Sequence, residues 1–110
     1  SLSLNGADIL LHTTNLVLPY CPAATITRAV ENRVFIVLCD RVGIEKNEKG
    51  EHRFIGLSRI VDPKGNILIS SNETEEHIHS VEIDYTLSRN KNLNEHNHLF
   101  NDRRTDLYQL

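Results

Sequence analysis

The strongest constraint on the fold is the apolar run Val34-Phe35-Ile36-Val37-Leu38-Cys39, the most hydrophobic stretch of the chain. A continuous run of this length, rich in branched aliphatic residues and followed by polar ones, is typical of a central strand of a sheet. Such a strand needs a neighbour on each side and a layer over each face. The sequence therefore predicts a sheet with residues 34–39 at its centre.

The segments before this strand predict a βα unit. Residues 7–14 form another mostly apolar run of strand length, which resembles a strand covered on both faces more than an alternating surface strand. Pro22 suits the first turn of a helix that continues to about Asn32, because proline fixes φ and its missing N–H is unpaired there in any case. One face of this helix is expected to carry the apolar residues Ala23, Ile26, Ala29 and Val30.

The segments after it predict further strands. Residues 54–61 and 66–70 are expected to form an antiparallel pair, because Asp62-Pro63-Lys64-Gly65 between them has the composition of a tight turn. Residues 43–52 are polar and predict an exposed loop. Residues 77–84 alternate between apolar and polar side chains, as a half-buried strand does.

The C-terminal region predicts little regular structure. A short helix is expected from Thr86, and the polar tail that follows contains a few apolar anchors. These are Leu99, Phe100, Leu107 and Tyr108.

Together these elements predict an α+β unit with a mixed sheet and helices on one face. The apolar strands exceed what short helices on one face can cover, so the other face needs a cover from outside the chain. Residues 1–6 are expected to be the last turn of a helix, since Asn5-Gly6 is a typical helix stop. We therefore expect residues 1–110 to be part of a larger domain.

Composition limits the partners and the compartment. The formal net charge is −3 and the Lys and Arg residues are scattered, whereas a nucleic-acid partner requires a basic face. No apolar run approaches the roughly 18–20 residues of a membrane span. The chain has only two cysteines, Cys21 and Cys39, which favours a reducing, cytoplasmic setting and a role for both as small buried apolar residues.

A series of short motifs covers nearly the whole chain. In order they are Leu4-Asn5-Gly6-Ala7-Asp8-Ile9-Leu10, Thr14-Asn15-Leu16-Val17-Leu18-Pro19-Tyr20, Thr27-Arg28-Ala29-Val30-Glu31-Asn32-Arg33-Val34-Phe35, Asp40-Arg41-Val42-Gly43, Phe54-Ile55-Gly56-Leu57-Ser58, Val61-Asp62-Pro63-Lys64-Gly65 and Asp102-Arg103-Arg104-Thr105-Asp106-Leu107-Tyr108. In the same order they resemble signatures of the C-terminal half of the nitrilase, or carbon–nitrogen hydrolase, superfamily. The second resembles the loop at the pocket edge of archaeal-type nitrilases.

This resemblance implies a fold and an activity. The superfamily fold is a four-layer α-β-β-α sandwich of two similar halves, and residues 1–110 would be the second half. The implied reaction is hydrolysis of a non-peptide carbon–nitrogen bond in a small amide, nitrile or carbamoyl compound by a Cys, Glu and Lys that lie upstream. No catalytic residue, metal or organic cofactor is therefore expected in this chain.

The resemblance also implies contacts. Asn15, Leu16 and Leu18 would form one wall of the substrate pocket, and residues 22–32 and 99–110 would contact another copy in a homo-oligomer. For Asn15 an equally simple interpretation is a loop cap that hydrogen-bonds nearby backbone.

Two alternatives compete with this interpretation. Cys39 precedes Asp40 much as a nucleophile would, but it ends an apolar strand and is interpreted as structural. The second alternative is a non-catalytic half-domain that pairs with itself and binds zinc through paired histidines. The simpler interpretation of these histidines is that they are solvated surface residues. These histidines are His77, His79, His96 and His98.

Overall fold

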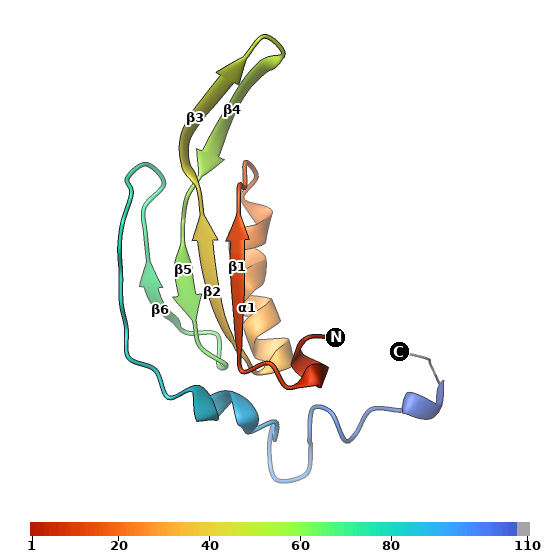
Figure 1. Cartoon of the computed structure of the whole chain (residues 1–110). Coiled ribbons are helices and arrows are strands. Elements are labelled where there is room, and N and C mark those ends of the chain that lie inside the picture. The colour runs from red at the N-terminus through yellow and green to blue at the C-terminus, as the bar shows by residue number, and fades with distance from the viewer. Residues whose placement is uncertain (108–110) are drawn as a thin grey trace.

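The computed structural model describes residues 1–107, and a four-stranded mixed sheet forms its centre (Figure 1). The sheet has the order β1-β2-β5-β6. β1 and β2 are parallel, whereas β2/β5 and β5/β6 are antiparallel. The elements that build the sheet and its cover are β1 (Ile9–Thr14), α1 (Tyr20–Asn32), β2 (Phe35–Asp40), β5 (Arg59–Val61) and β6 (Ile67–Ser70).

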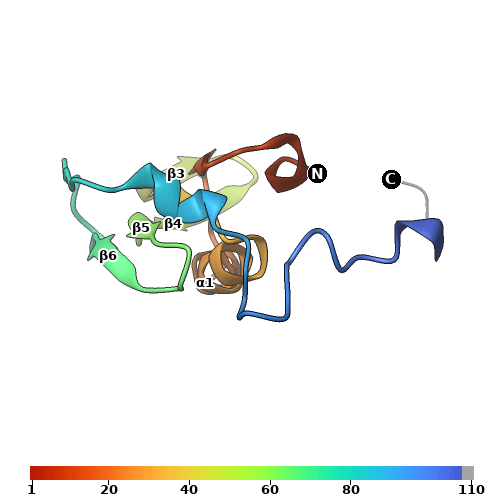
Figure 2. The same cartoon turned by 90° about the horizontal axis from the view of Figure 1, so that it is seen from below.

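The prediction of an α+β unit with a mixed sheet and a central strand at residues 34–39 is confirmed. β1 and β2 run parallel because the connection between them is a helix, which returns the chain to the starting edge. One α-helix rather than several covers the sheet, and Figure 2 shows it on one side only. The buried cluster beneath it comprises Ala29, Val34, Ile36 and Val61, with Leu10 and Ile26 packed against them.

Helix α1 has Pro22 in its first turn and ends at Asn32, as predicted, but its buried face differs from the prediction. It begins at Tyr20, so that Pro22 is the third helical residue. Its buried residues are Pro22, Thr25 and Ala29, whereas Val30 is 43% exposed. Thr25 occupies a core-facing position because its hydroxyl donates to the Pro22 carbonyl at 2.6 Å, which satisfies the buried polar group within the helix.

The predicted turn at residues 62–65 is confirmed. The Asp62 carboxylate accepts the Lys64 N–H at 2.8 Å and the Asn66 N–H at 2.9 Å. Gly65 has a φ of 88°, which a side-chain-bearing residue rarely adopts. The turn therefore joins β5 and β6 as the sequence indicated.

The prediction of a loop at residues 43–52 is wrong. β3 (Val42–Asn47) and β4 (Gly50–Ile55) form an antiparallel hairpin that extends beyond the end of the main sheet (Figure 1). Hydrophobic periodicity detects strands through burial. This ribbon is solvated over most of its length, so its polar sequence concealed a regular backbone ladder.

The prediction of one continuous strand at residues 54–61 is also wrong. The chain leaves β4 after Ile55 and enters β5 at Arg59. Between them Gly56 and Leu57 both have a φ of 58°, which is incompatible with an extended strand. The break lets the chain pass from the hairpin back into the main sheet.

Gly56→Ala is expected to destabilise the protein by about 2–5 kcal/mol, the sum of left-handed backbone strain and overpacking. A Cβ at Gly56 would lie 2.7 Å from Val42 Cγ1 and 2.9 Å from the Asn72 carbonyl oxygen. Gly6→Ala is the matched control, because Gly6 also has positive φ but nothing lies within 4 Å of its added Cβ. Urea unfolding midpoints that shift equally for both variants would contradict the steric part of this explanation.

The ends of the described chain contain short 3₁₀ helices. η1 (Ser3–Asn5) stops at Gly6, whose φ of 87° agrees with the predicted helix stop. η2 (Tyr85–Arg89) agrees with the predicted short helix, and η3 (Thr105–Leu107) lies near the C-terminus. Residues 77–84 form no strand, so that prediction is wrong. Of the predicted tail anchors, Tyr108 lies outside the described residues.

The sheet face opposite α1 carries a row of apolar side chains. The strand register places Leu11, Val37, Ile60 and Ile69 side by side on this face. Leu11 is 77% exposed, and the other three are half-buried. The expectation that the strand at residues 7–14 is covered on both faces is therefore wrong, because within residues 1–107 α1 covers one face only. Within residues 1–107 this row, which we call the apolar row, has no second layer like α1 above it.

Within residues 1–107, no helix combines the length and the apolar character that crossing a bilayer requires.

Candidate functional site

β1 and β2 end side by side at one edge of the sheet. They are parallel, and their register pairs Thr14 with Asp40. The loop of residues 15–19 follows β1 and leads into α1. Ligand sites of sheets with parallel strands gather outside the carboxyl ends of those strands. The 15–19 loop, in which the sequence predicted substrate contacts, therefore lies at a favourable edge.

Leu16 holds the 15–19 loop to the sheet through both of its backbone groups. Its N–H donates to Asp40 Oδ1 at 2.7 Å, and its carbonyl accepts the Ile55 N–H at 3.0 Å. Just before the loop, the Thr14 carbonyl accepts the Arg41 N–H at 3.2 Å. These bonds come from two separate segments, so they fix the course of the loop without using its side chains.

Ser58 in turn fixes the backbone of Asp40. Its hydroxyl accepts the Asp40 N–H at 2.9 Å and donates to the Asp40 carbonyl at 3.2 Å. Beside this pair, the Gly56 N–H donates to the Arg41 carbonyl at 3.0 Å. The motifs at residues 40–43 and 54–58 therefore contact each other beneath the 15–19 loop. Sequence reasoning noticed both motifs but not their contact with the loop.

The three residues predicted to bind substrate all lie on this loop. Asn15 is exposed, Leu16 is half-buried and Leu18 is 56% exposed. The Asn15 amide makes no side-chain hydrogen bond to any residue in the range 1–107, so the alternative role as a loop cap is not observed. None of the three lines the hollows described next.

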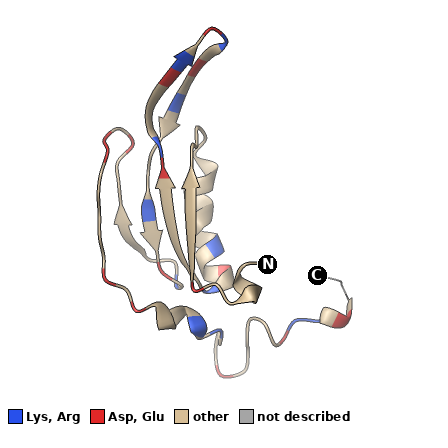
Figure 3. Ribbon diagram, viewed as in Figure 1, with Lys and Arg blue, Asp and Glu red and all other residues tan. Residues whose placement is uncertain are grey.

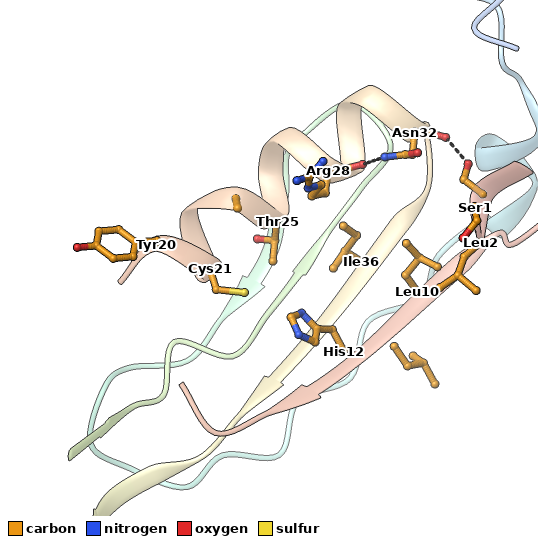
Figure 4. A pocket seen from close by; sticks show the side chains of 13 residues that line it. Ser1, Leu2, Leu10, His12, Tyr20, Cys21, Thr25, Arg28, Asn32 and Ile36 are labelled. Atoms are coloured by element: carbon orange, nitrogen blue, oxygen red, sulfur yellow. Dashed lines mark hydrogen bonds between the residues drawn. The ribbon is translucent and has the colours of Figure 1, made fainter. Parts of the chain in front are cut away.

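A largely apolar groove of about 710 Å³ lies between α1 and the outer strand β1 (Figure 4). In Figure 4 the side chains of His12 and Cys21 extend into the space between these two elements. Cys21 is a half-buried free thiol, as a small apolar residue would be. The groove runs along the outer edge of the sheet, because within residues 1–107 β1 pairs with β2 alone.

A smaller hollow of about 270 Å³ lies over the apolar row, where residues 77–79 pass beside Val37 and Ile69. Cys39 also lines it and is exposed. The prediction that Cys39 is buried is therefore wrong for this structure. The reason is its position on the sheet face that lacks a second layer, where an apolar strand residue remains open.

The histidines of the zinc alternative do not gather into one site. His77 and His79 stack with ring centroids 5.2 Å apart. His98 Nδ1 instead accepts backbone N–H groups of the tail, at 3.2 and 3.1 Å. Over residues 1–107, no three His, Cys, Asp or Glu side chains come together in a way that could hold a metal ion.

Charged residues of both signs are interspersed along the described part of the chain (Figure 3). Several form exposed ion pairs between near neighbours, with Arg28–Glu31 at 2.6 Å and Arg41–Glu45 at 2.8 Å as examples. Neutralising a phosphate backbone requires one continuous basic face. The mixture in residues 1–107 is instead typical of a solvated surface.

The segment after β6 is held to the start of β1 by a polar cluster. Asp8 accepts the Ser88 hydroxyl at 2.8 Å and the Arg89 guanidinium at 3.1 and 3.0 Å. The hydrogen bonds from Arg89 have the largest effect in lowering the pKa of Asp8 below its usual value, and the hydrogen bond from Ser88 lowers it further. Lys91 Nζ adds bonds to the Asn32 and Arg33 carbonyls at the end of α1. This cluster fixes the C-terminal segment below the sheet, far from the 15–19 loop.

The described residues form an α+β unit whose 15–19 loop lies at the carboxyl ends of the two parallel strands β1 and β2. Within residues 1–107, the sheet face opposite α1 is apolar and only partly covered. Residues 1–91 match the family described as carbon-nitrogen hydrolase. The chain therefore belongs to the carbon–nitrogen hydrolase, or nitrilase, superfamily, which confirms the resemblance seen in its motifs.

Individual relatives support this membership. The chain is 47% identical over 108 residues to a nitrilase of Pyrococcus abyssi, covering 98% of this chain and 40% of the relative. It is 33% identical over 106 residues to a 2-oxoglutaramate amidase of Bacillus subtilis, covering 94% of this chain and 38% of the relative. The crystal structure of the C. elegans NitFhit protein matches with a TM-score of 0.68 and 28% identity, covering 97% of this chain and 26% of that one. The chain thus spans about 40% of the length of the curated relatives that it matches.

Proposed function

We propose that this chain is the C-terminal half of a carbon–nitrogen hydrolase domain with a four-layer α-β-β-α sandwich. The family match over residues 1–91 carries the proposal. Two further observations support it: the chain spans 40% of the length of its archaeal relative, and the apolar row is open as an inner sandwich face would be.

The proposed reaction is hydrolysis of a non-peptide carbon–nitrogen bond in a small amide, nitrile or carbamoyl compound. In the superfamily mechanism a Cys thiolate attacks the carbon, a Glu transfers protons and a Lys stabilises the developing negative charge. These residues would precede Ser1. The motifs that this chain carries imply no metal or organic cofactor.

The proposed role of the 15–19 loop is to form one wall of the substrate pocket. Its backbone is held at Leu16 by Asp40 and Ile55, while the amide of Asn15 has no partner within residues 1–107. A free amide on a fixed loop is able to hydrogen-bond a polar substrate group. The exposed side chain of Leu18 would supply apolar contact.

The proposed assembly is a homo-oligomer in which residues 22–32 and 99–110 contact another copy. Val30, on the outer side of α1, is 43% exposed and Leu107 in the tail is 70% exposed, which leaves apolar surface for such contacts. Residues 108–110 lie outside the described structure.

A second candidate function is a non-catalytic half-domain that pairs with itself through the apolar row. The observation that favours it is the exposure of Leu11 beside three other apolar residues on one sheet face. Hydrolytic activity of the whole gene product separates the two candidates.

Asn15→Ala in the whole gene product is expected to lower kcat/KM for small amides or nitriles by about tenfold or more, the effect of removing one substrate hydrogen bond. The assay is ammonia release. Asn92→Ala is the control, because Asn92 is also exposed but lies outside both the 15–19 loop and the proposed contact segments. An active enzyme in which both variants match the parent would contradict the pocket-wall role of Asn15. A parent that releases no ammonia from any amide or nitrile would favour the half-domain.

A further inference from the structure

We infer that Asp40 is a positioning residue for the pocket: its carboxylate sets the course of the 15–19 loop and so the reach of Asn15 toward substrate. This inference rests on the proposed function of the loop. The carrying contact joins Asp40 Oδ1 to the Leu16 N–H at 2.7 Å, across 24 positions of sequence.

Asp40 is placed for this role by its own surroundings. It is the last residue of β2 and only 7% exposed. Ser58 bonds both its N–H and its carbonyl, so its backbone position is fixed. A carboxylate on a fixed backbone, with little room to rotate, holds its acceptor oxygen at one place beneath the loop.

The second carboxylate oxygen indicates that stability alone does not explain this residue. Oδ2 of Asp40 is buried and has no hydrogen-bond partner within residues 1–107. A buried acceptor without a donor costs free energy, and each such group in a folded protein needs an explanation. Holding the Leu16 N–H is the contact that this side chain makes in return.

The Leu16 N–H in the 15–19 loop uses a side-chain acceptor, the carboxylate of Asp40. The Leu16 carbonyl is bonded by the Ile55 backbone, whereas the Leu16 N–H has its acceptor in the Asp40 side chain at the end of β2. An amide oxygen would serve as well as a carboxylate oxygen. Acceptor geometry, rather than negative charge, is therefore the property that Asp40 contributes.

The test compares Asp40→Ala and Asp40→Asn in the whole gene product. Asp40→Ala is expected to raise KM for a hydrolysed amide or nitrile by about tenfold or more, with kcat changed less. Asp40→Asn keeps an acceptor and is expected to stay within about threefold of the parent KM. If Asp40→Ala does not fold, Asp40→Leu fills the space without an acceptor and takes its place.

The control is Asp62→Ala, which removes another carboxylate that accepts backbone N–H groups, in the β5–β6 turn at the other end of the sheet (Figure 1). It is expected to lower the urea midpoint without changing KM. A rise in KM equal to that of Asp40→Ala would show a general effect of instability and overturn the inference.

Amide hydrogen exchange gives a readout that does not depend on activity. Exchange at Leu16 is expected to accelerate in Asp40→Ala but not in Asp40→Asn or Asp62→Ala. Unchanged exchange in Asp40→Ala would overturn the inference, and so would accelerated exchange with an unchanged KM in an active enzyme. If the parent hydrolyses no amide or nitrile, the proposed function fails, while exchange still decides whether Asp40 positions the loop.

Discussion

The purified 110-residue chain is expected to associate in solution, so that light scattering gives a mass that is a multiple of 12.6 kDa. The reason is the apolar row across the face opposite α1. Leaving such side chains in water costs roughly 1.5–3 kcal/mol each, against a net stability of about 5–15 kcal/mol for a whole domain. In the isolated chain, the sheet of a second copy is the available cover, packed face to face at ~10 Å.

One substitution on that face tests the prediction. Leu11→Glu places a charge in the apolar row, where Leu11 is 77% exposed, and is expected to shift the chain toward monomer. Ile44→Glu is the matched control, because Ile44 is 50% exposed but lies on the β3–β4 hairpin. A parent chain that is a stable monomer with cooperative unfolding would show that residues 1–110 close their own core.

The main sheet was predictable because its signals are local. The run at residues 34–39 became the central strand β2. The residues Asp62 and Gly65 gave the β5–β6 turn, since the carboxylate and the positive φ act within a few positions of each other. A buried strand and a tight turn are therefore predictable from the sequence, because each depends on residues that are close together in the chain.

The predictions were wrong where the sequence carries little or no local signal for the structure. The β3–β4 hairpin is mostly solvated, so no apolar period marked its strands. The break before β5 depends on a positive φ at Leu57 as well as at Gly56, and a leucine gives no warning of that conformation. Cys39 was expected to be buried, but it lies on a face that the described residues leave open.

The position of the 15–19 loop between a strand and a helix was predictable, whereas its attachment to the sheet was not, and its substrate contacts stay a prediction. The resemblance identified Asn15, Leu16 and Leu18, and the structure places them together after β1. The bond from Leu16 to Asp40 joins residues that are distant in sequence. Spacing along the chain carries no signal for such a contact, whereas the structure shows it directly.

The covalent chemistry is expected to depend on residues outside this chain. The isolated chain should release no ammonia from amides or nitriles, because the implied Cys, Glu and Lys would precede Ser1. Cys39→Ala should make no difference, since Cys39 lies over the apolar row and not at the 15–19 loop. Turnover by the isolated chain that disappears in Cys39→Ala would contradict this expectation.

The complementary part of the prediction uses the Pyrococcus abyssi nitrilase, to which the chain is 47% identical. Its matching segment is replaced by residues 1–110 of this chain, while its own preceding residues are kept. The graft should fold because the two segments are 47% identical over 108 residues. In the chimera, the apolar row is expected to pack against a sheet face supplied by the preceding residues of the archaeal enzyme.

Nitrile hydrolysis by this chimera, measured as ammonia release, tests the central claim most directly. We expect the chimera to hydrolyse its nitrile within about tenfold of the parent kcat/KM, and both the truncated archaeal enzyme and the isolated chain to release none. A chimera that folds cooperatively but is inactive, or an isolated chain that is active, would contradict the claim that these residues form the C-terminal half of a carbon–nitrogen hydrolase.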